Sequence, residues 1–176
     1  GSDPTNDPLT YAWDLDGLPG FEAPGDKVTF SAGSRQAPLT VTVTVRVTDV
    51  HGQFAEDTAT IKVIWDFGGF VAPSNPAGVT QIKAGASHPV KFSLDGDQGL
   101  AVLGGNLLFQ RHACPTGADI GSPIIAERAE PFSYDPLTDT YKFVWKTKKA
   151  WAGWCGTLAV PLADGQTYTL EVAFKT

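Results

Sequence analysis

The sequence predicts an all-β protein built from two tandem β-sandwiches, and three features indicate this fold class. Short runs in which apolar and polar residues alternate recur along the whole chain, as half-buried strands require. Nineteen glycines and thirteen prolines are scattered between these runs, which is typical of many short strands joined by turns. No run has a convincing helical period. We therefore expect a first domain at residues 1–64, a connector at 65–79 and a second domain at 80–176.

The first domain is organised around Leu39–Thr48, the clearest strand in the sequence. Its valines fall on one face and its threonines on the other, which is the pattern of an antiparallel strand with one buried face. The other strands expected in this domain are 9–14, 28–31 and 54–64. Along the last of these, the residues expected to point inward are Ala59, Ile61 and Val63.

Two pieces of the first domain resemble a known family. They are NDPLTYAWDLDG, which starts at Asn6, and VTVRVTD followed by TATIKV, which ends at Val63. Residues 6–63 resemble a PKD domain, an immunoglobulin-like β-sandwich common in secreted and cell-surface proteins. The family's usual Trp-Asp-Phe-Gly-Asp-Gly turn is here Trp-Asp-Leu-Asp-Gly, and its first two strands belong upstream of residue 1. The resemblance therefore implies a sandwich with an open edge, and we expect either self-association through that edge or a loose N-terminal half.

The second domain shows about seven short strands separated by turns, which indicates a second sandwich. The strands expected in it are 89–94, 106–112, 124–128, 140–146, 157–162 and 168–175. The connector before it is rich in glycine and proline but also holds three large aromatic residues, Trp65, Phe67 and Phe70. Because such side chains are unfavourable in water, we expect them to pack at the junction between the domains.

Residues 65–176 also resemble a known family. The resemblance is carried by NPAGVTQIKAGASHPVKFSLDGDQGL, by the hairpin YDPLTDTYKFVWKT and by KAWAGWC. These pieces resemble the PxKF-type domain, which follows PKD or other immunoglobulin-like repeats near the C-termini of actinobacterial secreted proteins. The motif that names the family is here Pro89–Phe92. The resemblance implies an exported protein and its architecture, and little chemistry.

Cys114 and Cys155 are the only cysteines in the chain. Two isolated cysteines without a Cys-x-x-Cys motif do not bind a metal without further ligands. We expect one disulfide bond in an exported domain, worth about 3–4 kcal/mol by the loop-entropy estimate. A nucleophilic Cys114 activated by His112 is the alternative, but residues two apart on a strand lack the approach that a general base needs.

Residues 142–155 concentrate tryptophan and lysine, and a binding and a structural interpretation compete there. In the binding interpretation, Trp151 and Trp154 lie in a glycine-containing loop and stack on sugar rings. Exposure of both rings on one flat patch would favour this interpretation. Three lysines would then contribute hydrogen bonds or meet an anionic surface polymer: Lys146, Lys148 and Lys149.

In the structural interpretation of the same stretch, Trp145 is a core residue and Trp154 packs on the disulfide bond, as tryptophans do in immunoglobulin-type cores. The lysines then form a solvated face.

Four aspartates in turns are weak candidates for a structural calcium site: Asp95, Asp97, Asp14 and Asp16. The first pair has the spacing of the first half of a calcium loop, but Asn106 stands where such a loop needs a glutamate. The second pair is expected near Asp49, at one end of the first domain. Turn capping by the aspartate side chains explains all of them more simply, so we expect no cofactor.

Charge, hydropathy and the search for catalytic motifs limit the classes of function that the sequence supports. A net charge of −6 argues against nucleic acid as the main partner, and no stretch approaches the length of a membrane span. No catalytic motif is found. We therefore expect non-catalytic accessory modules of a larger secreted or cell-surface bacterial protein, acting as spacer, presentation or adhesion domains. The expected partners are other domains of the parent chain and a glycan or cell-surface polymer.

Two other functions stay open from the sequence. One is a carbohydrate-binding module that uses Trp151 and Trp154. The other is a fragment that contributes to a secreted hydrolase, which would need a concave pocket lined by paired carboxylates.

Overall fold

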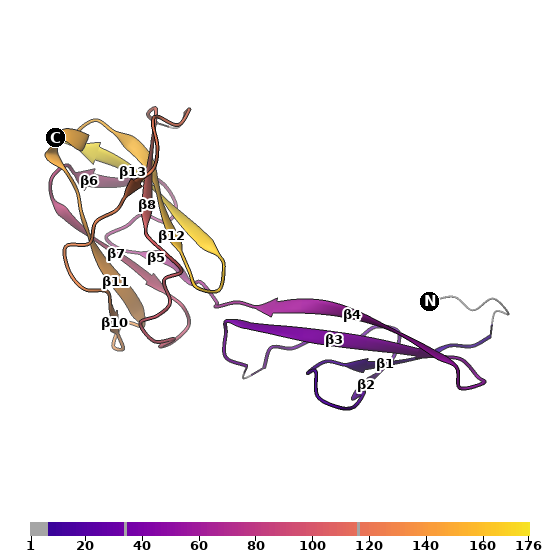
Figure 1. Ribbon diagram of the computed structural model, residues 1–176. Helices are drawn as coiled ribbons and strands as arrows, with labels where there is room; N and C mark the ends of the chain where they lie inside the picture. The colour runs from indigo at the N-terminus through magenta and orange to yellow at the C-terminus, as the bar shows by residue number, and fades with distance from the viewer. Residues whose placement is uncertain (1–6, 34, 116) are drawn as a thin grey trace. The chain divides into compact units, whose positions relative to one another are not determined.

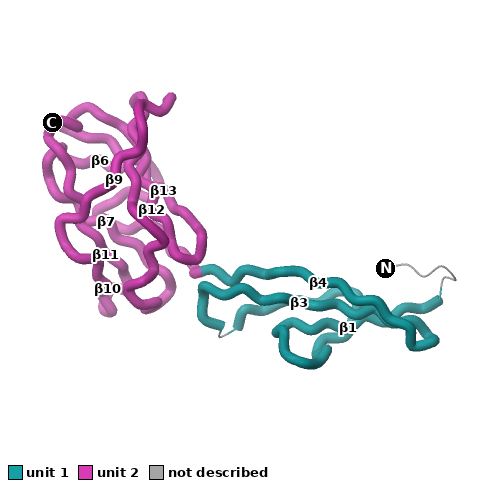
Figure 2. The backbone as a smooth tube through the Cα atoms, in the orientation of Figure 1, with its two compact units in different colours: residues 1–64 teal, residues 65–176 magenta. Residues whose placement is uncertain are grey.

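The computed structural model describes residues 7–33, 35–115 and 117–176, and it confirms an all-β fold (Figure 1). Residues 1–6, which the sequence analysis assigns to the first domain and, at Asn6, to the PKD resemblance, lie outside the described residues. The chain divides into two compact units, residues 1–64 and 65–176 (Figure 2). The one helical element in the described ranges is η1, a single 3-10 turn at Lys149–Trp151.

One antiparallel sheet forms the first unit, with the strand order β2-β1-β3-β4. Its strands are β1 (Thr10–Asp14), β2 (Ala23–Pro24), β3 (Leu39–Thr48) and β4 (Phe54–Val63). The expected long hairpin is confirmed, because β3 and β4 pair over their full lengths from Leu39 opposite Val63 to Thr48 opposite Phe54. As a result, β4 is an edge strand of this sheet.

A small core lies on one face of this sheet and is built around Val41, Val43 and Val63. The prediction of a strand at 28–31 is wrong. In the described part of the chain no strand pairs with this segment, and Phe30 packs on the face of the sheet instead. Ala59 was expected inward but is exposed, because β4 is an edge strand and the covering residues lie elsewhere on the face.

Two sheets form the second unit. In the first, the order is β10-β11-β7-β5; its strands are β10 (Ser133–Asp135), β11 (Thr140–Lys146), β7 (Ser87–Ser93) and β5 (Gly69–Val71). In the second, the order is β6-β13-β12-β8-β9; its strands are β6 (Thr80–Lys83), β13 (Thr167–Lys175), β12 (Cys155–Pro161), β8 (Leu108–His112) and β9 (Ile124–Ile125). All neighbours are antiparallel except β6 and β13.

Aromatic rings fill the space between these two sheets. The ring of Trp145 on β11 lies 5.3 Å from that of Phe109 on β8 and 5.6 Å from that of Phe174 on β13, measured between centroids. All three rings are buried. Contacts from one sheet to the other at this distance show that the sheets pack face to face as a sandwich.

The aromatic residues of the expected connector pack within the second unit. Trp65 and Phe70 are buried, and Phe67 stacks on Tyr168 of β13 with a centroid separation of 3.7 Å. Phe70 lies on β5, which pairs with β7. The stretch from Trp65 onward is therefore part of the second unit.

Candidate binding site

Trp151, one of the two tryptophans considered for ligand binding, lies in the core. Its exposed fraction is 3%, and its ring centroid is 5.4 Å from those of Phe109 and Phe174. The short turn η1 folds this large apolar side chain back into the sandwich, where its burial is favourable. The two loop tryptophans therefore do not form one exposed patch, and Trp151 offers no ring face to a sugar.

Trp154 is half-buried, and two neighbours already contact its ring. The ring of Trp151 stacks near it at 5.9 Å and an interplanar angle of 20°. The guanidinium carbon of Arg111 lies 4.1 Å from the centre of the Trp154 ring, which is cation–π geometry. These contacts fix Trp154 as the end of the aromatic core.

The three lysines named with these tryptophans are exposed: Lys146, Lys148 and Lys149. Lys148 is the one that approaches an aromatic ring, with its Nζ 5.9 Å from the centre of Trp151. None of the three forms an ion pair with another residue in the described part of the chain. Their placement fits a solvated face.

Cys114 and Cys155 form the expected disulfide bond, which joins the loop after β8 to the start of β12. Cys114 therefore carries no thiol for nucleophilic attack. The neighbouring His112 is buried, with its Nδ1 3.0 Å from the Ala113 carbonyl oxygen and its Nε2 3.0 Å from the Glu171 carboxylate. The hydrogen bond to Ala113 and the contact with Glu171 raise the pKa of His112.

Asp14, Asp16 and Glu22 form the one group of acidic side chains in the described ranges whose geometry could hold a metal ion. One ligand atom from each lies within 4.8 Å of the others. Glu22 was not expected from the sequence, because it follows in a loop with no metal-binding spacing. The Asp14 carboxylate accepts hydrogen bonds from the backbone N–H groups of Asp16 and Gly17, which is the turn capping that the sequence predicted.

Asp49 is not a member of that group. Its Oδ1 accepts hydrogen bonds from the backbone N–H groups of His51 and Gln53 and so caps its own hairpin turn. Asp95 and Asp97 do not belong to it either. Asp95 occupies the left-handed region with φ of 54°, and Asp97 accepts a hydrogen bond of 2.9 Å from the Gly99 N–H.

Asp97 lines an open hollow of about 410 Å³ in the second unit, which we call the aromatic hollow. Its walls come from the loop after β7 and from the residues around β10; they are Asp97, Gly99, Leu100, Phe132, Ser133, Tyr134 and Pro136. The volume falls in the range of small-ligand sites. The hollow combines two half-buried aromatic rings with one carboxylate.

A hydrogen-bond network centred on Asp139 holds one wall of the aromatic hollow. Asp139 accepts hydrogen bonds from the Tyr134 hydroxyl at 2.9 Å, from the Ser93 hydroxyl at 2.9 Å and from the Gly96 N–H at 3.0 Å. These bonds keep the pKa of Asp139 below its usual value. Burial and the bond to Asp139 raise the pKa of Tyr134 to about 12, so its hydroxyl stays a donor at physiological pH.

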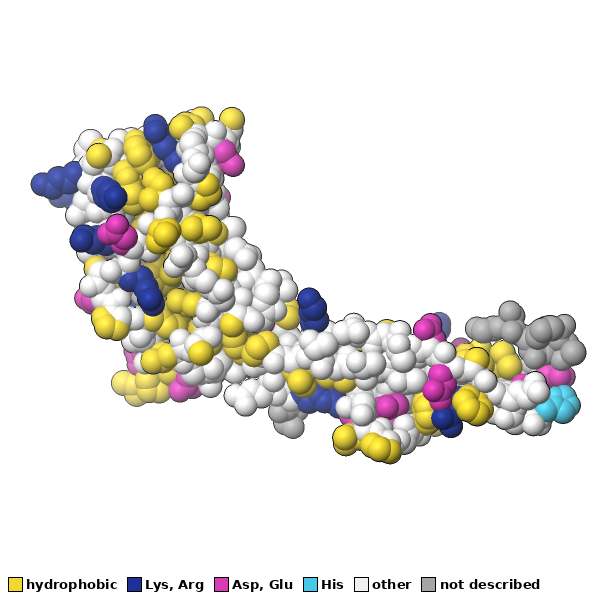
Figure 3. All heavy atoms as spheres, in the orientation of Figure 1, with side chains coloured by type: hydrophobic (Ala, Val, Ile, Leu, Met, Phe, Trp, Pro, Cys, Tyr) yellow, Lys and Arg dark blue, Asp and Glu magenta, His cyan; other side chains and the backbone are white. Residues whose placement is uncertain are grey.

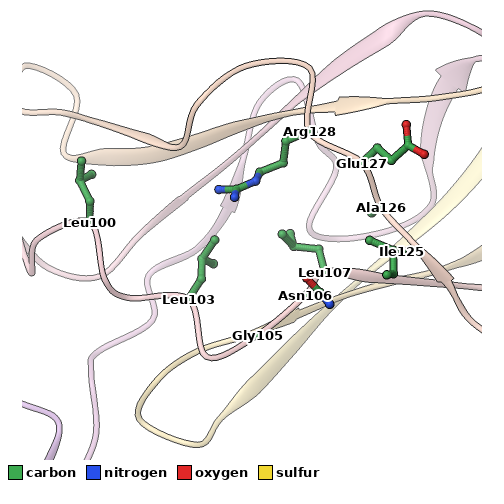
Figure 4. A pocket seen from close by; sticks show the side chains of 9 residues that line it. All are labelled: Leu100, Leu103, Gly105, Asn106, Leu107, Ile125, Ala126, Glu127 and Arg128. Atoms are coloured by element: carbon green, nitrogen blue, oxygen red, sulfur yellow. The ribbon is translucent and has the colours of Figure 1, made fainter.

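A second hollow, which we call the apolar hollow, has a volume of about 370 Å³ (Figure 4). Leu103, Leu107 and Ile125 contribute its apolar surface, and Glu127 and Arg128 also line it. The Arg128 side chain points toward Leu100 and Leu103, whereas that of Glu127 points away from them (Figure 4). Leu100 lines both hollows, so they meet at this side chain. The space-filling view shows hydrophobic side chains at the surface of this unit among lysines and arginines (Figure 3).

Comparisons with known proteins add only weak structural likeness. No family model and no curated protein matches the chain. A solved structure of SGBP-B from the Bacteroides ovatus mixed-linkage glucan utilization locus, in complex with a mixed-linkage heptasaccharide, aligns with a TM-score of 0.28 and 15% identity. The alignment covers 97% of this chain and 38% of that one. A likeness at this level does not bear on what this chain binds.

Within the described residues, no helix has the length and the apolar character that crossing a bilayer requires.

Proposed function

We propose that this chain is a pair of non-catalytic modules of a larger exported protein, and that they space or present its other domains. The observation that carries this proposal is the Cys114–Cys155 disulfide bond. It ties the loop after β8 to the neighbouring strand β12 of the same sheet, and it consumes the cysteine that the sequence offered as a nucleophile. Disulfide bonds persist in oxidising compartments, which supports a secreted or cell-surface location.

The resemblance to a PKD domain and to a PxKF-type domain supports the same proposal and is part of it. The resemblance implies an actinobacterial source, and it implies that the partners of this chain are further domains of the same parent chain. The open edge of β4 is the place where another segment or another copy would add to the first unit.

The two alternative functions receive less support. A carbohydrate-binding site built on Trp151 and Trp154 needs two exposed rings, and Trp151 is buried. A contribution to a hydrolase needs paired carboxylates in a concave site. The aromatic hollow has one carboxylate on its wall, Asp97, and the apolar hollow also has one, Glu127.

Single-molecule stretching of the whole chain tests the spacer function. A spacer must stay folded under load, so we expect the second unit to unfold in one step well above the force that stretches an unfolded chain. The disulfide bond shields a sequence separation of 41 residues from extension. Reduction should therefore lengthen the unfolding step by about 140 Å, at roughly 3.4 Å per residue.

Extension of the oxidised second unit at forces that merely stretch an unfolded chain would refute the spacer function. The non-catalytic part is tested separately, by incubation with polysaccharides and cell-wall material and chromatography of the soluble products. A released product that is absent when the protein is heat-inactivated would refute it.

A further inference from the structure

We propose that the aromatic hollow binds a neutral carbohydrate, with a sugar ring lying against Phe132 and Tyr134 and the carboxylate of Asp97 accepting its hydroxyl groups. This inference goes beyond the spacer function, because it assigns a ligand class to a site in the second unit. It also moves the binding site away from the tryptophans that the sequence suggested.

The two rings of the hollow are the exposed end of a buried aromatic layer. Phe132 stacks on Tyr141 with a centroid separation of 5.6 Å and an interplanar angle of 12°. Tyr141 in turn stacks on Phe92 at 5.5 Å, and both are fully buried. Tyr134 lies 4.9 Å from Tyr141. The orientation of the rings is therefore set by the core before any ligand arrives, which lowers the entropic cost of binding.

An aromatic face suits the apolar face of a sugar. The face of the ring carries partial negative charge, and the C–H groups on one side of a pyranose carry partial positive charge, so the two attract each other when stacked. The Tyr134 hydroxyl is already committed to Asp139. Its ring is thereby held in place as a surface for stacking.

Asp97 supplies the polar contact. Its Oδ1 accepts the Gly99 N–H at 2.9 Å and lies 3.4 Å from the Tyr141 hydroxyl. Its Oδ2 has no hydrogen-bond partner among the residues that the structure describes, so this oxygen is free to accept a hydrogen bond. A carboxylate accepts hydrogen bonds only, and sugar hydroxyls are the donors that match it.

The charge of the hollow selects against other ligands. Its wall carries Asp97 and no lysine, arginine or histidine, so a phosphate, sulfate or uronic acid seated in this hollow would be repelled; the adjoining apolar hollow carries one residue of each sign, Glu127 and Arg128. A cation gains most inside a closed aromatic cage. The hollow is open, and its one carboxylate is exposed to solvent, where an ion pair is worth little.

The adjoining apolar hollow indicates a ligand longer than one sugar. Leu100 is 58% exposed and lines both hollows, so a chain that leaves the aromatic hollow over this side chain enters the apolar hollow. We therefore expect a hexasaccharide to bind more tightly than a disaccharide of the same linkage.

The test is a titration of the whole ¹⁵N-labelled chain, followed by amide chemical shifts. The probes are neutral hexasaccharides of glucose, mannose, xylose and N-acetylglucosamine, an oligogalacturonate as the anionic probe and a chitosan oligosaccharide as the cationic probe. We expect at least one neutral probe to shift the amides of residues 97–100 and 132–135. Phe132→Ala should weaken that binding by tenfold or more, and Asp97→Asn by about threefold to tenfold.

Two variants serve as controls. Leu137→Ala changes a residue of the same hairpin that is 95% exposed and outside the hollow, and it should bind as the wild type does. Trp154→Ala should also bind as the wild type does. The amide spectrum of each variant shows whether it is folded, and Asp97→Asn keeps the proposal testable if Phe132→Ala does not fold.

Three results would overturn the proposal. One is the absence of shifts at the hollow with every neutral probe, and another is binding of the charged probes alone. The third is neutral-probe binding that Trp154→Ala abolishes while Phe132→Ala leaves it intact. All three leave the spacer function untouched, because the stretching experiment contains no glycan.

Discussion

Loss of the Cys114–Cys155 bond should destabilise the second unit strongly and leave the first unit unchanged. The bond closes a loop with a sequence separation of 41 residues. For a loop of this length the chain-entropy model gives about 4 kcal/mol at 25 °C. With roughly 2 cal/mol/K of unfolding entropy per residue over residues 65–176, this corresponds to a fall in Tm of roughly 18 °C.

The assay compares thermal unfolding of the oxidised and the reduced wild type by circular dichroism. Reduction removes the bond without a substitution, which matters because Cys155 is buried and a Cys155→Ala change would add a packing defect. The transition of the first unit, whose described residues contain no cysteine, is the internal control. A change in Tm of less than about 4 °C, equivalent to about 1 kcal/mol, would refute the loop-entropy reasoning. A free thiol in the untreated native protein would contradict the bond itself.

Three further predictions follow from other contacts. In a denaturant titration, Gly156→Ala should lower the free energy of unfolding by about 1–3 kcal/mol, because a Cβ there would overlap the Phe109 ring. Gly105→Ala, whose new Cβ would have its nearest atom at 3.8 Å, should be nearly neutral in the same titration. The hydrogen bond to the Ala113 carbonyl and the contact with Glu171 raise the pKa of His112, so these contacts stabilise the fold fully below about pH 6.5, and that stabilisation is lost as the pH rises through the folded pKa. Glu171→Gln should therefore lower Tm most at pH 5.5, by an amount equivalent to about 1 kcal/mol because Glu171 is 40% exposed; a difference that grows toward pH 8.5 would contradict this. Finally, β4 has one open edge among the described residues. We therefore expect either self-association of the chain, measured by sedimentation, or fast exchange of the amide protons along β4. A monomer whose β4 amides exchange as slowly as those of β13 would contradict both.

The sequence predicted the strands well where one face of a strand is buried and the other is not. The strand Leu39–Thr48 is found with the expected bounds, because alternating valine and threonine leaves no ambiguity about its period. The residues 28–31 show the limit of the same reasoning. The side chain of Phe30 packs on the core of the sheet, but a strand also needs a neighbour for its backbone hydrogen bonds, and a local pattern does not show whether one is there.

The placement of the tryptophans was harder to predict for a different reason. A glycine-containing loop is typical of binding residues, and this made Trp151 and Trp154 candidate ligand contacts beside the structural interpretation. The competing contribution is the favourable free energy of burying an indole ring, and it decides the position of Trp151. Whether a loop folds inward depends on the space that the two sheets leave at their ends, and this is not visible in the sequence.

The aromatic hollow was not predicted because its parts are far apart in the chain. Asp97 drew attention only through its spacing to Asp95, and Phe132 and Tyr134 lie about 35 residues further on. Pairing of β7 with β11, with Phe92 opposite Tyr141, brings the two loops to the same end of one sheet. A register between strands is a long-range property, so the site follows from the fold rather than from a motif.

One buried residue links the core of the second unit to its proposed binding surface. The ring of Tyr141 is fully buried between Phe92 and Phe132, while its hydroxyl accepts the Gln98 N–H at 2.5 Å. The loop that carries Asp97 is therefore attached directly to the aromatic layer that orients Phe132. Because both walls of the hollow rest on this side chain, Tyr141→Phe would keep the aromatic packing and free only the loop. Binding that depends on a preorganised Asp97 should weaken in this variant even though the fold is retained.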